Sequence, residues 1–163
     1  MKKLFFIALA ILLMASVSYA ATVGLAVDPK NNREVWTTTV YVDETSSTTV
    51  DAGNVVCWDV DDSSGDDKNW VENCDSETGL VAGVVWPADI SGGSIGLIAI
   101  KGSVPVDVPS TGYGSVIAAN AILCSSSTAG VAAPCTTLDR EAYGFGFAVG
   151  DSSGGVVQAY INP

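Results

Sequence analysis

The stretch CWDVDDSSGDDKNWVENC, from Cys57 to Cys74, concentrates oxygen-bearing side chains between two cysteines. Calcium takes about six to eight hard oxygen ligands, and a glycine such as Gly65 helps a loop wrap around the ion. The carboxylates and amides of the stretch belong to Asp59, Asp61, Asp62, Asp66, Asp67, Asn69, Glu72 and Asn73. We identify a candidate cation site, with calcium as the candidate ligand, at Asp61, Asp62, Asp66 and Asp67.

The spacing of this acidic loop does not fit an EF-hand. Counted from Asp59, the position that an EF-hand reserves for glycine is Ser64, and the position of its closing glutamate is Trp70. An irregular calcium loop therefore remains open. A solvated turn remains open as well, because Asp, Ser, Gly and Asn are the residues that turns prefer.

Catalytic chemistry has few candidate residues in this chain. There is no histidine, so Ser-His-Asp and Cys-His arrangements are excluded. A pair of carboxylates could serve a glycosidase, but with eighteen acidic residues such a pair arises by chance. We expect a protein that is not an enzyme, and a secreted hydrolase is the last of the alternatives.

Residues 1–20, MKKLFFIALAILLMASVSYA, are typical of a secretory signal with a mature chain beginning at Ala21. The apolar run is shorter than the roughly 20 residues of a spanning helix, so no membrane span is expected after signal removal. Lys2 and Lys3 are the only charged residues removed, which takes the net charge from −11 to −13. Such acidity disfavours nucleic acid and anionic lipid as partners, and divalent cations would relieve it.

All four cysteines lie in the exported part, where an even number predicts two disulfides. Of the three connectivities, we favour Cys57 with Cys74 and Cys124 with Cys135, because each pair closes a loop between strand-like segments. A zinc site is the competing interpretation, but the chain has no C-x-x-C pair and no histidine.

Short runs of β-branched and apolar residues, separated by Gly, Pro, Asp and Ser, predict strands throughout the mature chain. The expected strands are 21–27, 34–42, 54–60, 80–86, 94–100, 103–108, 115–123, 142–150 and 155–161. This spacing indicates an all-β sandwich or barrel of about eight or nine short strands, stapled by two disulfides. We divide the chain into the signal peptide (1–20), an N-terminal strand or arm (21–30) and a single β-domain (31–163).

Two local patterns make finer predictions. The sequence KGSV at 101–104 predicts a tight hairpin turn between two strands, with Gly102 at positive φ. In AYGFGFAVG, alternation places Tyr143, Phe145 and Phe147 on one face of a strand.

From about Val81 to Ile161, three stretches follow one another: GLIAIKGSVPVDV, ANAILCSSSTAGVA and AYGFGFAVGDSSGGVVQAYI. Their order resembles the small β-domains that decorate the capsids of tailed phages. In those domains a strand, a K/R-G turn and a second strand precede a G-x-x-L-x-x-S-x-x-G segment, a G-x-A segment and a closing strand. The resemblance implies a non-enzymatic domain that sits on a symmetric protein lattice. This chain carries an export signal and paired cysteines, whereas phage capsids assemble in the cytosol. The resemblance therefore implies a similar domain that associates into polymers, and it does not imply that the protein is part of a virion.

The mature N-terminus, ATVGLAV, is a short apolar strand set apart by the polar stretch DPKNNR. Its candidate intersubunit residues are Thr22, Val23, Leu25 and Val27. Such an arm either adds to the sheet edge of the next subunit or pairs within its own sheet. We expect a secreted structural subunit, at the cell surface or outside it, that forms a homopolymeric filament or surface layer. The alternative is a monomeric binding module for carbohydrate or a surface protein, using Trp58, Trp70 or Trp86.

Overall fold

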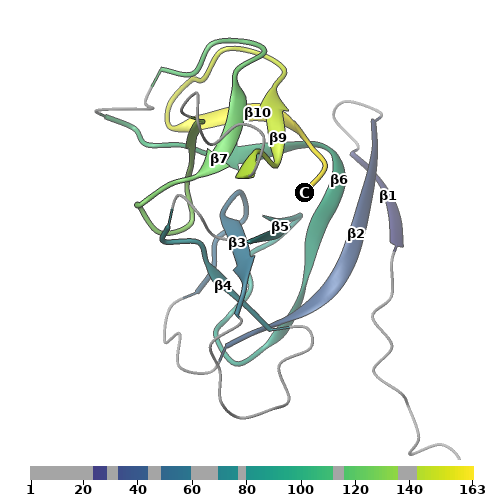
Figure 1. Cartoon of the computed structure of the whole chain (residues 1–163). Helices are drawn as coiled ribbons and strands as arrows, with labels where there is room; N and C mark the ends of the chain where they lie inside the picture. Colours follow the sequence, from purple (N-terminus) through teal and green to yellow (C-terminus); the bar gives the residue numbers. More distant parts are fainter. Residues whose placement is uncertain are drawn as a thin grey trace, which may run out of the picture.

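The computed structural model describes residues 24–28, 33–43, 49–59, 70–76, 80–111, 116–135 and 143–163. These residues form ten strands in one continuous sheet (Figure 1). The strands are β1 (Gly24–Asp28), β2 (Arg33–Val42), β3 (Val55–Trp58), β4 (Trp70–Asn73), β5 (Val81–Val85), β6 (Ile95–Asp107), β7 (Ile122–Ser125), β8 (Ala132–Pro134), β9 (Gly146–Ala148) and β10 (Val156–Ile161).

Five of the strands close into a ring. β2 pairs with β4 in parallel, and antiparallel pairings then run from β4 to β3, from β3 to β5 and from β5 to β6. An additional antiparallel pairing of β6 with β2 completes the circuit. Closure removes the exposed edges that an open sheet would leave at these strands. The ring forms the lower part of the molecule in Figure 1.

A cluster of small branched side chains, the barrel core, fills the ring. All five ring strands contribute inward side chains, at alternate positions except in β5, where the inward residues Ala82 and Val85 are three residues apart. Val50 and Ile90 join the cluster from outside the strands, and their backbones form an isolated bridge. The buried members are Val40, Val42, Val50, Val56, Val71, Ala82, Val85, Ile90 and Ile98.

The thirteen-residue strand β6 continues beyond the ring. Its first half pairs with β2 and β5, and its second half, Gly102 to Asp107, pairs with β10. The predicted hairpin at 101–104 is therefore wrong, although the positive φ of Gly102 is confirmed at 119°. β6 bends as it passes from the ring to the second layer (Figure 1). Gly102 lies where its partners change, opposite both Val35 of β2 and Ile161 of β10, beside an irregularity in the β2–β6 register.

Beyond this bend a second layer covers the outside of the ring. β10 pairs with β9, β9 with β7 and β7 with β8. The strands β7, β9 and β10 lie in the upper part of Figure 1. The alternation predicted for 142–150 is wrong, because β9 begins only at Gly146. Phe145 precedes the strand and turns inward, 2% exposed, whereas Phe147 faces solvent, 44% exposed.

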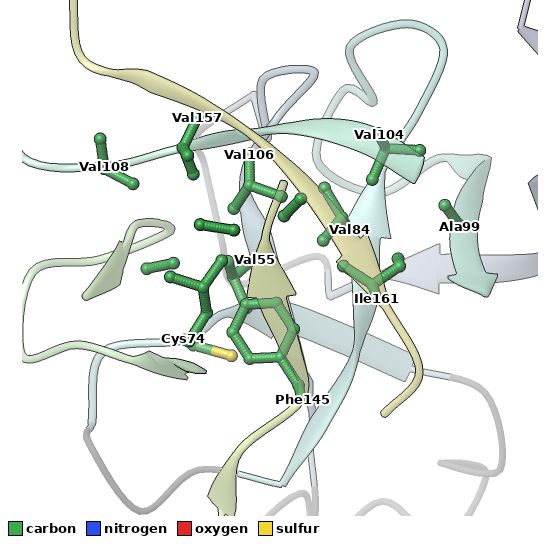
Figure 2. Close-up of a cluster of buried hydrophobic side chains, with 14 of the residues drawn as sticks. Val55, Cys74, Val84, Ala99, Val104, Val106, Val108, Phe145, Val157 and Ile161 are labelled. Carbon is green, nitrogen blue, oxygen red and sulfur yellow. The ribbon is translucent and has the colours of Figure 1, made fainter. Parts of the chain in front are cut away.

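The two layers share a larger cluster, the interlayer core. Val55 and Val84 project outward from the ring, and Val104, Phe145 and Ile161 meet them from the second layer (Figure 2). Every one of these five side chains is at least 98% buried. Burial of apolar surface at this junction is the main force holding the layers together.

The predicted all-β fold and both predicted disulfides are confirmed. Cys57 bonds to Cys74 and Cys124 bonds to Cys135, each with a Cα–Cα distance of 5.0 Å. Two disulfides are compatible with an extracellular location. The described residues form ten strands, where about eight or nine were expected for the chain. The expected strands 94–100 and 103–108 merge into β6, while the short strands β4 and β8 were not expected.

Candidate functional site

The candidate cation residues Asp61, Asp62, Asp66 and Asp67 lie outside the described residues. The Cys57–Cys74 disulfide and the pairing of β3 with β4 join the two ends of their loop. Within the described ranges, no group of three or more acidic, histidine or cysteine side chains could hold a metal ion. The calcium site therefore stays a prediction.

Part of the predicted arm is β1, which pairs with β2 of its own chain. Leu25 lies opposite Trp36, and Val27 lies opposite Glu34. Thr22 and Val23 fall outside the described residues. β1 ends the order of strands in the sheet, so its far edge meets no strand among the described parts of the chain.

The opposite end of the sheet, β8, presents a poorer edge for pairing. β8 has only three residues. In this part of the chain every second residue forms backbone hydrogen bonds with β7; for example, the amide of Cys135, just after β8, donates to the carbonyl of Ile122 at 2.9 Å. Ala132 and Pro134 therefore direct their backbone groups outward. Proline has no N–H to donate, which blunts this edge and leaves β1 as the open one.

The three tryptophans expected to form a binding platform are partly occupied by packing. Trp58 packs against the barrel core and Trp86 against the interlayer core. Trp70 lies against Tyr41, with ring centroids 4.9 Å apart. All three are half-buried, so each presents only part of its ring to solvent.

Sequence reasoning missed a different group, which we call the aromatic face: Trp36, Tyr160 and Phe147, with Lys101 and Glu34. Trp36 is 47% exposed, and the rings of Phe147 and Tyr160 stack with centroids 5.6 Å apart and planes 25° apart. The Nζ atom of Lys101 lies 5.9 Å from the Trp36 ring centroid. A hollow of about 570 Å³ opens here, lined by Glu34, Trp36, Lys101, Gly102, Ser103 and Tyr160.

The aromatic face was missed because strand register, which the sequence does not state, assembles it. Trp36 lies opposite Lys101, Ser103 lies opposite Tyr160, and Tyr160 lies opposite Phe147. The face thus runs across β2, β6 and the consecutive strands β9 and β10, which come from three separate parts of the sequence. The sequence offered one signal for this face: β2, β9 and β10 each carry an aromatic residue at an outward position, namely Trp36, Phe147 and Tyr160.

One carboxyl group outside this face is electrostatically perturbed. Burial raises the pKa of Asp107, and the nearby Asp51 carboxylate raises it further. Asp107 ends β6, and its amide donates to the carbonyl of Gly53 at 2.9 Å. This link ties the turn before β3 to the second layer.

Comparisons with models of known protein families and with curated proteins found no match for this sequence. Within the part of the chain that the structure describes, no helix has the length and apolar content needed to cross a bilayer.

Proposed function

We propose that the protein is a secreted, non-enzymatic structural subunit that assembles with copies of itself into an extracellular filament or surface layer. The observation that most supports this proposal is the position of β1 at the end of the sheet, with β2 as its neighbour. The resemblance to capsid decoration domains, with their polymeric association, points in the same direction.

Exchange of β1 between subunits is the proposed mode of assembly. In its own chain β1 forms five residue pairs with β2, from Gly24 opposite Thr37 to Asp28 opposite Arg33. A β1 donated by a neighbour would form the same pairs, so the exchange changes little in pairing energy. Each subunit then donates one strand and accepts another.

This mode supports an open polymer when each subunit accepts β1 from one neighbour and donates its own to another, whereas simple edge pairing does not. If β1 stayed in place, its free edge would pair most readily with a second β1, because Pro134 blunts the β8 edge. Such a contact uses the same surface on both subunits and stops at a dimer. Donation to a neighbour's β2 joins different surfaces and continues from one subunit to the next.

Charge would limit such an assembly. The mature chain carries a net charge of −13, and packed copies repel one another unless counterions intervene. A calcium ion held by Asp61, Asp62, Asp66 and Asp67, or acidic contacts between subunits, would relieve the repulsion. We therefore expect assembly to depend on divalent cations.

Cysteine cross-linking distinguishes exchange from pairing within the chain. Val27 and Glu34 lie opposite each other in the register, and opposed Cα atoms in antiparallel strands are about 4.5–5.5 Å apart, within disulfide range. We would mix the single variants Val27→Cys and Glu34→Cys under assembly conditions, oxidise them and analyse them without reductant. Exchange predicts a covalent dimer of the two variants.

The matched control mixes Val27→Cys with Leu80→Cys, because Leu80 is exposed and lies outside β1 and β2. This mixture should give no dimer. Electron microscopy of the mature protein, with and without EGTA, should show filaments or sheets that chelation disperses. Dispersed particles in every condition, with no cross-link between the mixed variants, would refute the assembly proposal.

A further inference from the structure

We propose that the aromatic face binds a saccharide of low net charge. This inference goes beyond self-assembly and does not depend on β1 exchange. The face has the elements of a sugar site: exposed rings, polar side chains beside them, and a hollow of about 570 Å³. Ligand sites typically measure about 300–1,000 Å³.

Strand pairing fixes the backbone positions from which these side chains project. Tyr160 lies on β10 between Ser103 of β6 and Phe147 of β9, and both of those neighbours are directly opposite it. Trp36 on β2 lies opposite Lys101 of β6. Lys101 and Ser103 are two residues apart on that strand, so they belong to the same face of the sheet. Sites built on paired strands keep their geometry better than sites built on loops, so the rings form a preorganised row.

The polar groups include donors and acceptors. Glu34 supplies carboxylate oxygens and Lys101 supplies an ammonium group, and both line the hollow. Ser103, 2% exposed, accepts a hydrogen bond of 2.9 Å from the Nε2 atom of Gln158, which fixes that amide beside the rings.

These groups select against the other classes of small ligand. A cation would meet the Lys101 ammonium, and an anion would meet the Glu34 carboxylate. A purely apolar ligand would strip water from both charges without replacing its hydrogen bonds. A sugar ring has apolar C–H faces that stack on aromatic rings and hydroxyl groups that both donate and accept, so it satisfies all the groups present.

The present contact of Lys101 with Trp36 does not block the face. At 5.9 Å from the ring centroid the ammonium is near the outer limit of a cation–π interaction, and such contacts are weak at exposed sites. Lys101 is therefore free to move from the ring toward a sugar hydroxyl. Because the hollow is open to solvent, we expect affinity in the millimolar to high-micromolar range.

The test is a titration of the folded mature protein, labelled with ¹⁵N, with neutral hexasaccharides. The probes are β-1,4-linked glucose, β-1,4-linked N-acetylglucosamine and α-1,4-linked glucose. We expect at least one probe to shift the indole signal of Trp36 while those of Trp58, Trp70 and Trp86 stay in place.

Variants identify the side chains responsible. Trp36→Ala and Tyr160→Ala should each weaken binding about tenfold, since each removes a stacking ring. Leu80→Ala is the matched control, because Leu80 is an exposed apolar residue, 62% exposed, that does not line the hollow, and it should bind as the parent does. Circular dichroism checks that each variant is folded, and the Trp36 indole signal of the parent locates binding independently of any variant.

Three results would overturn the proposal. The first is no shift of the Trp36 indole with any of the three probes at millimolar concentration. The second is binding that Trp36→Ala and Tyr160→Ala leave unchanged. The third is a change in sedimentation of Trp36→Ala without saccharide binding by the parent, which would make the face a contact between copies of the chain.

Discussion

Replacing Gly102 with alanine tests whether β6 must bend at this residue to connect the ring to the second layer. Gly102 has a φ of 119°, which L side chains rarely adopt. A Cβ atom placed on it would lie 2.5 Å from the carbonyl oxygen of Glu34 and 3.0 Å from the Cα of Val35. Both obstacles belong to the backbone of β2 and cannot rotate away.

The expected destabilisation follows from these two effects. Forcing a residue with a Cβ into a positive-φ conformation costs about 1–2 kcal/mol. Overpacking against fixed neighbours costs about 1–3 kcal/mol. We therefore expect Gly102→Ala to lower the free energy of unfolding by about 2–5 kcal/mol, a large part of the roughly 5–15 kcal/mol typical of a domain.

Alanine variants at three other glycines separate the dihedral cost from the steric cost. The free energy of unfolding of each variant would be measured by urea denaturation of the oxidised protein. Gly154 has a φ of 63° but no atom within 4 Å of an added Cβ, so Gly154→Ala reports the dihedral cost alone. At Gly83, which has no positive φ, an added Cβ would collide with the carbonyl oxygen of Ala99, so Gly83→Ala reports the steric cost alone. Gly150 has neither feature, and Gly150→Ala should change stability by less than about 0.5 kcal/mol.

The reasoning fails if Gly102→Ala is no more destabilising than Gly150→Ala. It also fails if Gly102→Ala matches Gly154→Ala, because the β2 backbone would then exert no steric effect. An effect larger than either single-cost variant, at an unchanged denaturant slope, is the expected result.

Two further predictions concern charge and cross-links. The raised pKa of Asp107 means that the folded protein binds this proton more tightly than the unfolded chain, whose usual value is 3.8. The resulting stabilisation is present below pH 3.8 and is lost as pH rises through the folded-state pKa, so Asp107→Asn should be more stable than the parent at pH 7 and equally stable below pH 3.8. Equal stability at both pH values in denaturation curves would contradict this. The Cys57–Cys74 disulfide closes a separation of 17 residues, so replacing both cysteines with alanine should cost about 3 kcal/mol in the same assay. A loss below about 1 kcal/mol would show that the ring closes without this constraint.

The sequence predicted the all-β class of the fold, but it did not predict which strands pair with one another. Alternating apolar residues and turn residues predicted strands correctly at 34–42, 80–86 and 155–161, because these properties are local. The closure of β6 on β2 joins Val35 to Gly102 and Tyr41 to Ile95, and no local pattern specifies such partners.

Bulges limited the prediction of faces. In β5, Ala82 is skipped between the residues that pair with β3, so Val81 and Val84 both face the interlayer core while Ala82 and Val85 face the barrel core. Simple alternation cannot give that result, since an extra residue reverses the order of the faces. The aromatic face escaped prediction for another reason: the pairing of β2, β6, β10 and β9 assembles it, and no local pattern specifies that pairing.

The sharing of β6 between both layers has a consequence for the order in which the chain folds. All five ring strands lie within residues 33–107, so the ring has its strands once the first two thirds of the chain are available. Val55 and Val84, however, are covered by Phe145 and Ile161, near the C-terminus. A folding chain therefore carries an uncovered apolar surface until its last strand is in place, and that interval is when it is most exposed to aggregation.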